Sequence, residues 1–438
     1  MNCIIQTKHY DERVSNDAND FVNRTAEFAL LDTEAKHGGL VVVFGRRRVG
    51  KTRLLTEWLR RQKGLYSQAI EGPMALQLEQ VWQDTTSGLG GSLVPKTWAE
   101  YLELVRIHAP RVLCLDEFPY LVASDPTLPS VLQRWLDHAR PKKTMVILSG
   151  SSSRAMNDTF LNRAAPLYGR ARRLMHVEPM SYGAFCASRG IAAKKIESFS
   201  LYSLVGGIPR YWELLDARAG LIENAERLYF GFAPYMEQEP SRLLRDERLG
   251  GAMAVAILEL IGRDVHRPSE IAARLSVPQT NLSRPLQELI DASLVEREIP
   301  FGQSVRTAKH ALYKLRGPSL RFWFSVYSPH RTRFARYGEA EKAELIHQHT
   351  SQVFEDHCRS LYPGASRYWD ARSELDLVLE EPRGLAVFEV KYKKTSEAER
   401  KKLLDNLQER FERSALASKT ARVRYELLDS RVLESTEM

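Results

Sequence analysis

Cysteine, long apolar runs and targeting signals are scarce in this sequence. No window approaches the 18 apolar residues of a membrane span, and the N-terminal residues lack the apolar core of a signal peptide. The sequence contains no CxxC pair, so it does not predict a zinc site. The few cysteines are scattered and do not suggest a disulfide framework. We therefore expect a cytoplasmic protein with no membrane partner. The four cysteines of the 438 residues are Cys3, Cys114, Cys186 and Cys358.

Internal repeats and low-complexity tracts are also absent, which excludes solenoid and fibrous architectures. A chain of 438 residues is too long for one ordinary core and predicts about three or four domains. Hydrophobic residues make up 43%, enough for globular packing. The net charge of +8 and the pI of about 9.2 mildly favour a polyanionic partner.

Apolar runs that alternate with helical patterns divide the chain. Segments such as "LVVVF", "RVLCLDEF" and "TMVILSG" read as buried strands between helices, which indicates a parallel α/β sheet. A helical region follows, and then a compact set of helices with two short strands. We expect an N-terminal tail at 1–20, an α/β core at 21–175, a helical region at 176–250, the compact set at 251–316 and a mixed α/β domain at 317–438.

The sequence "GRRRVGKT" fits the phosphate-loop pattern G-x-x-x-x-G-K-[ST]. It follows the strand "LVVV" and opens the helix "RLLTEWLRRQ", which is the required context. Backbone N–H groups would surround phosphate oxygens, Lys51 would reach the β/γ-phosphates, and the Thr52 hydroxyl would face Mg²⁺. The sequence therefore predicts ATP and Mg²⁺ as cofactors. The predicted nucleotide-binding residues of the loop are Gly45, Arg46, Arg47, Arg48, Val49, Gly50, Lys51, Thr52 and Arg53.

The strand "RVLCLDEF" supplies the acids for hydrolysis. Asp116 ends the apolar run and should hold Mg²⁺ through water, while Glu117 is placed as the base that polarises the attacking water. The competing interpretation is an ordinary Asp-Glu cap after a core strand.

Three further residues are candidates at the nucleotide site. Ser151, after "VILSG", could sense the γ-phosphate, although serines also end strands for turn reasons. Arg170 is a candidate lid or trans-acting catalytic arginine, and a solvated basic surface is the equal alternative. Arg210, after "GGIP", is a similar candidate that would bind nucleotide.

Taken together, "FVNR", "GRRRVGKT", "LDEF", "SGSS", "LYGR" and "GGIPRYW" resemble the archaeal and bacterial STAND-class ATPases, which are relatives of AAA+ proteins. The resemblance covers most of residues 20–330. It implies a switch-like ATPase core, a helical lid at 176–250 that carries the GG-x-P element, and then a winged helix at 251–316. Three consecutive arginines in the loop are a departure, and whether they touch nucleotide or a partner stays open.

The compact set at 251–316 has the pattern of a winged helix, with a second helix expected from about 279 to 292. The polar residues at its start are of types that contact bases and phosphates, so we expect DNA as a partner. Winged helices also serve as protein connectors, and this alternative stays open. The predicted DNA-binding residues are Gln279, Thr280, Asn281, Ser283 and Arg284.

The stretch "SELDLVLEEPRGLAVFEVKYKK" reads as a hairpin centred between Pro382 and Arg383. Residues whose numbers sum to 765 then face each other, which places Asp376 opposite Glu389 at a Cβ separation of about 4.5–5.5 Å. Like charges at that distance destabilise a hairpin unless a cation lies between them. Two converging carboxylates suit a divalent metal ion, and Lys391 would stabilise charge on a phosphate. A solvated polar face is the alternative.

Together with the upstream helix "SQVFEDHCRSLY", this hairpin resembles the PD-(D/E)xK nucleases, which have the restriction-endonuclease fold. The resemblance implies that Glu355, Asp376 and Glu389 hold a metal ion and that Lys391 is catalytic. The segment "LYKLRGPSLRFWFSVYSP" resembles the join to such a domain in some of these ATPases, although Gly317 stands where we expect an acidic residue.

The predicted fold class is α/β: a P-loop parallel-sheet ATPase core with a helical lid, a winged helix, and a C-terminal mixed α/β restriction-endonuclease-like domain. The predicted function is an ATP-hydrolysing switch that acts on DNA through a Mg²⁺-dependent nuclease domain and that forms homo-oligomers on binding nucleotide. The alternative is a non-cleaving, ATP-regulated DNA-binding protein. The Asp-Glu pair and the appended domains disfavour a third interpretation, a small-molecule kinase.

Overall fold

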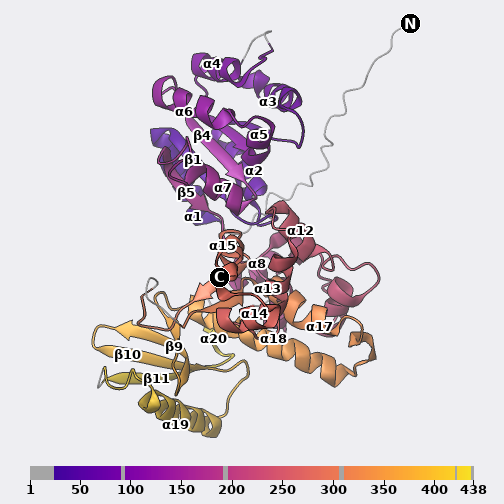
Figure 1. The fold of residues 1–438 in the computed structure, drawn as a ribbon, viewed down its shortest axis with the longest axis vertical. Coiled ribbons are helices and arrows are strands. Elements are labelled where there is room, and N and C mark those ends of the chain that lie inside the picture. The colour runs from indigo at the N-terminus through magenta and orange to yellow at the C-terminus, as the bar shows by residue number, and fades with distance from the viewer. Residues whose placement is uncertain (1–23, 90–93, 191–195, 305–309, 420–421, 436–438) are drawn as a thin grey trace.

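The computed structural model describes residues 24–89, 94–190, 196–304, 310–419 and 422–435. The expected N-terminal tail at 1–20 and the first three residues of "FVNR" lie outside these ranges. Figure 1 shows an upper body, which is the ATPase core, and a lower body that holds the rest of the chain. Helices α12 and α15 lie where the two bodies meet.

A five-stranded sheet forms the middle of the upper body, with the order β2-β3-β4-β1-β5 and parallel pairing throughout. In β1, Val41 and Val43 pack on one face with α1 and α2, while Leu40 and Val42 pack on the other with α3 to α6. Apolar residues on both faces explain the continuous run in the sequence. The strands are β1 Gly39–Phe44, β2 Leu65–Gln68, β3 Val112–Asp116, β4 Met145–Gly150 and β5 Ala171–His176.

Seven helices of the core flank this sheet, and they include the predicted helices after Lys51 and near Leu128. Strand β5 is an edge strand that the sequence analysis did not identify, because basic, exposed residues such as Arg172 and Arg173 interrupt its apolar pattern. The helices are α1 Thr25–His37, α2 Lys51–Gln62, α3 Met74–Leu89, α4 Trp98–His108, α5 Phe118–Ser124, α6 Leu128–His138 and α7 Ser153–Phe160.

The predicted helical lid follows, and its GG-x-P element joins the lid to a distant segment. Gly206 ends α9 with φ +62°, and a Cβ there would lie 2.9 Å from Cδ of Pro318. Its carbonyl accepts a hydrogen bond from Trp212 Nε1 at 2.6 Å. The helices are α8 Tyr182–Arg189, α9 Ile196–Val205, α10 Pro209–Trp212, α11 Leu221–Ala225, the π-helix η1 Glu226–Phe230 and α12 Glu239–Asp246.

Among the described residues, three α-helices, one 3₁₀-helix and two antiparallel strands come next, in the order in which the sequence analysis expected helices and then strands. The predicted helix at 279–292 begins as a 3₁₀-helix and becomes α-helical at Ser283. Pro285 explains the change, because a proline cannot donate an i→i−4 hydrogen bond. The elements are α13 Ala252–Gly262, α14 Pro268–Leu275, η2 Gln279–Leu282, α15 Ser283–Asp291, β6 Val295–Glu298 and β7 Leu312–Leu315.

The segment after β7 packs with the preceding helices rather than starting a separate body. Leu320 and Phe324 belong to the core of residues 251–316, while Phe322 and Val326 belong to the core that the ATPase and lid share. The packing therefore does not break at the predicted boundary of 317. The helices are α16 Pro318–Phe322, the π-helix η3 Trp323–Tyr327, α17 Ser328–His330 and the 3₁₀-helix η4 Phe334–Arg336.

A mixed four-stranded sheet ends the chain, with the order β11-β10-β9-β8. Strands β9 and β10 form the predicted hairpin, and α19 crosses over to β11, which pairs parallel to β10. This C-terminal mixed sheet and the parallel core sheet agree with the predicted fold class. The elements are α18 Glu339–Ser360, β8 Ser366–Trp369, β9 Glu374–Glu381, β10 Gly384–Val390, α19 Glu397–Arg413, β11 Val423–Leu428 and α20 Val432–Ser435.

Candidate functional site

The phosphate loop joins β1 to the N-terminus of α2, as predicted. Gly45 has φ +153°, and a Cβ there would lie 2.5 Å from the carbonyl oxygen of Val177, so the backbone passes too close for any other residue. Lys51 is buried and donates hydrogen bonds to the carbonyls of Gly45 (2.9 Å) and Arg46 (3.1 Å). Burial lowers the pKa of Lys51, against the effect of the nearby Glu117 and Asp116. The ammonium therefore lies inside the loop.

Thr52 and Asp116 meet at the carboxyl ends of β1 and β3. The Thr52 hydroxyl donates to Asp116 Oδ2 at 2.6 Å, and the Tyr66 hydroxyl donates to the same oxygen at 3.0 Å. Mg²⁺ fits this hydroxyl–carboxylate pair, because it prefers oxygen ligands. When bound, Mg²⁺ neutralises charge on the β- and γ-phosphate oxygens. The sequence analysis did not single out Tyr66, which is the second hydroxyl that donates a hydrogen bond to Asp116.

Glu117 follows in a left-handed conformation with φ 54°. Its Oε2 accepts hydrogen bonds from the Ser151 hydroxyl at 2.8 Å and from the Ser151 N–H at 3.2 Å. Strand β4 lies between β1 and β3, so its end brings Ser151 to the base. The candidate base and the candidate sensor thus form one hydrogen-bonded pair.

The three loop arginines contact residues from outside the ATPase core. Arg47 Nη1 lies 2.7 Å from both carboxylate oxygens of Asp246, and Arg48 forms an ion pair with Glu239. Both acids lie on α12. Arg46 is buried, and its Nη1 donates a 3.4 Å hydrogen bond to a carbonyl of the segment after β7. The sequence analysis named the arginines but missed these acids. Three adjacent cations need counter-ions, but the sequence does not show which acidic residues supply them.

Helix α12 also contacts the other side of the site. Glu247, directly after α12, accepts hydrogen bonds from the Ser152 hydroxyl (2.9 Å) and from the backbone N–H groups of Ser153 (3.0 Å) and Arg154 (3.2 Å). A carboxylate is stabilised at this position, because it meets unpaired N–H groups at the N-terminus of α7. Acids at the end of one helix therefore contact both the phosphate loop and the segment after β4.

The two outlying arginine candidates have local partners. Arg170 Nη2 forms a 2.9 Å ion pair with Asp137 of α6, and its Nη1 donates to the Pro166 carbonyl at 2.8 Å. Arg210 is exposed and pairs with Glu213 in the next turn. Neither contact joins these arginines to the phosphate loop, so a role at the site stays a prediction for both.

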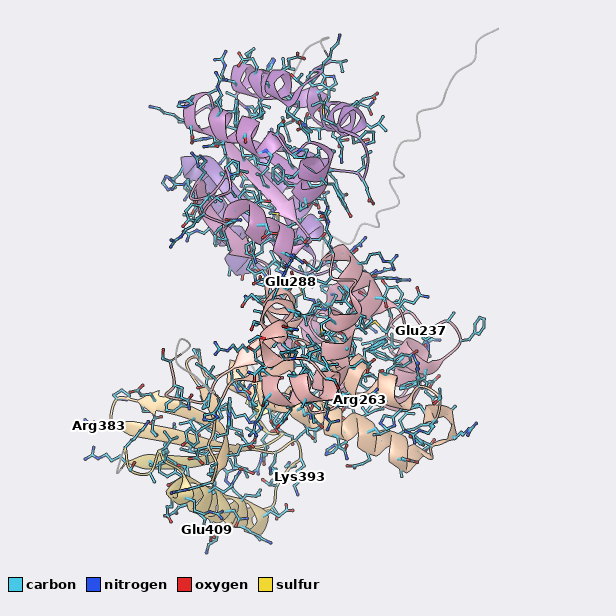
Figure 2. The ribbon with its side chains drawn as sticks, in the orientation of Figure 1. Glu237, Arg263, Glu288, Arg383, Lys393 and Glu409 are labelled. Atoms are coloured by element: carbon cyan, nitrogen blue, oxygen red, sulfur yellow. The ribbon has the colours of Figure 1, made fainter. Side chains whose placement is uncertain are left out.

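The predicted DNA-binding residues share one exposed end of the η2–α15 unit. One turn after Arg284, α15 contacts the core: Glu288 forms a 3.1 Å ion pair with Arg154 of α7. Figure 2 shows Glu288 where the upper and lower bodies meet. Arg284 also pairs with Glu288 at 3.0 Å, although its side chain is mostly exposed. The exposed residues are Gln279, Thr280, Asn281, Ser283 and Arg284.

The C-terminal hairpin has the predicted register. Leu377 pairs with Phe388 and Val378 with Val387, so paired residue numbers sum to 765. Asp376 and Glu389 follow these pairs, and Asp376 Oδ2 accepts a 2.9 Å hydrogen bond from the Val390 N–H. Burial, and then the charge of Glu389, raises the pKa of Asp376. The two carboxylates are therefore close enough to repel each other, while their role as a metal-binding pair stays a prediction.

Side chains of the protein itself compensate the charge of Glu389. Its carboxylate accepts a 2.8 Å ion pair from Lys391 and a second ion pair from Arg410 of α19. Against the effect of burial, the Glu389 carboxylate raises the pKa of Lys391. The sequence analysis missed Arg410, which lies 21 residues away on the crossover helix.

The third predicted acid lies in a cavity beside the hairpin. Glu355 of α18 lines a cavity of about 430 Å³, together with Lys314 of β7 and Arg367 of β8. Burial, and then Asp376 and Asp356, raises its pKa to about 7. Within the described ranges, no group of three or more His, Cys, Asp or Glu side chains is arranged to hold a metal ion. Asp376 thus interacts electrostatically with both Glu355 and Glu389, but the three acids do not form the predicted three-ligand group.

Among the described residues, no helix is long and apolar enough to cross a membrane.

Comparison with known proteins agrees with the phosphate-loop geometry. Residues 21–215 match a family model described as an ATPase domain predominantly from Archaea, and residues 323–403 match one described as archaeal and bacterial proteins of unknown function. An uncharacterized protein of Methanocaldococcus jannaschii is 24% identical over 448 residues, covering 95% of this chain and 97% of the relative.

Two solved structures are similar at lower identity. The Walker-type ATPase of Pyrococcus abyssi superposes with a TM-score of 0.53 at 19% identity, over 72% of this chain and 99% of that one. The Aeropyrum pernix ORC2 protein has a TM-score of 0.39 at 12% identity. The match covers 76% of this chain and 96% of that chain. The N-terminal half of this chain therefore contains a P-loop ATPase domain.

Proposed function

We propose that this protein is an ATP-hydrolysing switch of the STAND class that acts on DNA. The observation that carries this proposal is the position of the η2–α15 unit. It contacts the ATPase core through the Glu288–Arg154 ion pair, and in the turns that precede Glu288 it exposes polar side chains such as Asn281 and Arg284. A change at the nucleotide site can thus reach the element that is suited to contact DNA. The basic net charge of +8 supports the same partner.

DNA binding by this surface can be measured with a fluorescent duplex at several salt concentrations, with and without ATP and Mg²⁺. Affinity should fall as salt rises, because phosphate contacts release counterions. Replacing Arg284 with Ala should reduce the slope of log K against log salt by about 1 if it contacts a phosphate. The matched control is Arg218→Ala, an exposed lid arginine. If both variants bind DNA with equal affinity, residues 251–316 would instead serve as a connector between parts of the protein.

We also propose Mg²⁺-dependent DNA cleavage by the C-terminal domain. Asp376 and Glu389 interact at the end of the hairpin, Lys391 is within 2.8 Å of Glu389, and the charge of Asp376 reaches Glu355. Mg²⁺ would supply a polarised phosphate oxygen and an activated water there. The Arg410–Glu389 ion pair favours the second candidate, a non-cleaving DNA-binding regulator, because it gives Glu389 a partner without a metal ion.

A plasmid assay separates these two candidates. The full chain is incubated with supercoiled DNA, Mg²⁺ or Mn²⁺, and ATP, and nicked product is quantified. Cleavage that disappears in both Asp376→Asn and Lys391→Ala would support the nuclease, whereas equal cleavage in these variants would indicate a contaminant. DNA binding without cleavage under any metal condition would establish the regulator.

Homo-oligomer formation on nucleotide binding belongs to the same proposal. Arg210 is exposed, and its partners are Glu213 in its own segment and Tyr235. Because these contacts leave most of the side chain in water, it can approach a second subunit. Sedimentation of the chain with and without ATP tests this. A monomer under both conditions would leave Arg210 without a trans-acting role.

A further inference from the structure

Arg47 and Arg48 connect the phosphate loop to α12 through two ion pairs of different character. In the Arg47–Asp246 pair, the Arg47 side chain is 49% exposed and the Asp246 side chain is 25% exposed. In the Arg48–Glu239 pair, the Arg48 side chain is only 20% exposed and the Glu239 side chain only 4%. Glu239 also accepts a 2.5 Å hydrogen bond from the Tyr211 hydroxyl. The first pair is in contact with water and readily exchanged, whereas the second is a buried anchor.

Asp246 of the exchangeable pair lies beside Glu117, the predicted catalytic base. Asp246 and Glu117 line the same cavity of about 530 Å³, together with Ser151 from the segment after β4. Burial contributes most to the lowered pKa of Lys51, and the positive charge of Arg47, which belongs to the phosphate loop, lowers that pKa further. Its guanidinium therefore lies close enough to act on the ammonium that bound phosphates would meet. A guanidinium binds carboxylate and phosphate oxygens with the same planar geometry.

Asp246 is also next to the residue that holds α7. Glu247 accepts hydrogen bonds from Ser152, Ser153 and Arg154, and Arg154 forms an ion pair with Glu288 of α15. A shift at the end of α12 would therefore change the position of the segment after β4 and, through the Arg154–Glu288 ion pair, of the proposed DNA-binding helix. Figure 1 shows α12 and α15 together at the junction of the two bodies.

We propose that the Asp246 carboxylate is an internal counter-ion that nucleotide phosphates displace from Arg47, so that ATP binding releases the C-terminal end of α12 while the Arg48–Glu239 pair remains as its pivot. This inference rests on the proposed function, in that the loop binds ATP. It assigns regulation of the nucleotide site to α12. By linkage, the Arg47–Asp246 contact weakens ATP binding, and ATP weakens that contact equally.

Nucleotide titrations of four full-length chains test the exchange: the unmodified protein, Asp246→Asn, Arg47→Ala, and the double variant. Removing the competing carboxylate should tighten ATP binding about two- to fivefold, the range expected for an exposed ion pair. This gain should vanish when Arg47 is already Ala. The matched control is Asp216→Asn, which breaks an exposed lid pair with Arg227 and should leave affinity unchanged. Hydrogen exchange of α12 amides should rise when ATP is added.

The other outcomes separate failure of the exchange from failure of the proposed function. A gain from Asp246→Asn that persists in the Arg47→Ala background would mean simple repulsion between Asp246 and the phosphates. Unchanged or weaker ATP binding by Asp246→Asn, or unchanged exchange at α12, would make the pair purely structural. Absence of ATP binding by the unmodified chain would overturn the proposed function and the exchange with it. Failure to bind DNA, with the affinity pattern intact, would overturn only the DNA part of the function.

Discussion

Lys51 and Glu117 occupy the same nucleotide site but should fail in different ways when replaced. Lys51 places a buried ammonium inside the loop, so Lys51→Ala should weaken ATP binding about 100-fold or more, since hydrogen bonds to charged groups contribute about 1.5–3 kcal/mol each. Glu117→Gln keeps its size and should retain binding, while hydrolysis falls about 10²–10⁴-fold with loss of the base. Nucleotide binding and phosphate release measure the two effects. The control Lys36→Ala changes an exposed lysine of α1.

The ion pair between Arg410 and Glu389 predicts the behaviour of the C-terminal acids without any nuclease assay. Replacing Arg410 with Gln leaves the buried Glu389 with Lys391 as its remaining ion pair, and it should lower the free energy of unfolding by about 1–3 kcal/mol. Adding Glu389→Gln should restore most of that loss, because the uncompensated charge is gone. Thermal unfolding of the three chains measures this. If Mg²⁺ binds beside Glu389, it should stabilise Arg410→Gln more than the unmodified chain.

Single residues show where the sequence was informative and where it was not. Gly45, Lys51 and Thr52 were predictable because one contiguous strand–loop–helix holds them. The partner of Arg47 was not, because Asp246 lies 199 residues away and many acids have the same local pattern. Gly317 stands where an acid was expected, and a Cβ there would lie 3.0 Å from Arg46 Nη1. An acid at that position would have neutralised this buried arginine.

At the level of elements, α9 and α18 form a buried polar contact that should respond to acid. His349 of α18 donates from Nε2 to the Ser203 carbonyl at 2.8 Å. Burial lowers its pKa to about 3, and the nearby Arg321 adds to this while Asp356 opposes it. Because the unfolded chain binds a proton near pH 6.5 and the folded chain does not, stability falls as pH drops from 6.5 toward 3.

The loss from His349 between pH 7.5 and 5 should be about 2 kcal/mol. Gln at this position can still donate to Ser203 but does not titrate, so His349→Gln should flatten the pH profile of thermal unfolding over that range. His357, whose pKa burial lowers to about 4, should still contribute an acid-dependent loss of the same sign. Identical pH profiles for His349→Gln and the unmodified chain would mean that the α9–α18 contact opens before His349 titrates.

Elements were predictable where one pattern dominates. The β9–β10 register followed from a short turn and alternation, and β1, β3 and β4 followed from unbroken apolar runs. Strand β5 was missed because an edge strand is paired on one side only and tolerates exposed arginines. Its place depends on pairing with β1, which local sequence does not encode.

At the scale of the whole molecule, the predicted domains share their apolar cores. One cluster of buried side chains runs from Val41 of the ATPase sheet through Phe199 of the lid to Phe354 of α18 and Phe388 of the C-terminal sheet. A buried hydrogen bond of 2.9 Å between the hydroxyls of Ser200 and Tyr392 reinforces this contact. Changes in the pattern of helices and strands suggested boundaries at 250 and 317, but only the folded chain shows that packing crosses them.

This continuity predicts how the protein responds to truncation. A chain that ends at residue 316 loses Phe322, Val326 and Phe354 from the shared core and leaves the apolar faces of the lid exposed to water. Burial of such side chains contributes about 1.5–3 kcal/mol each, so the shortened chain should unfold at a much lower temperature, bind a hydrophobic dye and aggregate. A chain that ends at residue 360 keeps α16 to α18 and should retain more stability. Cooperative unfolding of the 316-residue chain at the temperature of the full protein would contradict this and show that the C-terminal domain is an independent appendage. In that case ATP-dependent changes at α12 would have no packed route to the hairpin acids, because only the chain connection would join them.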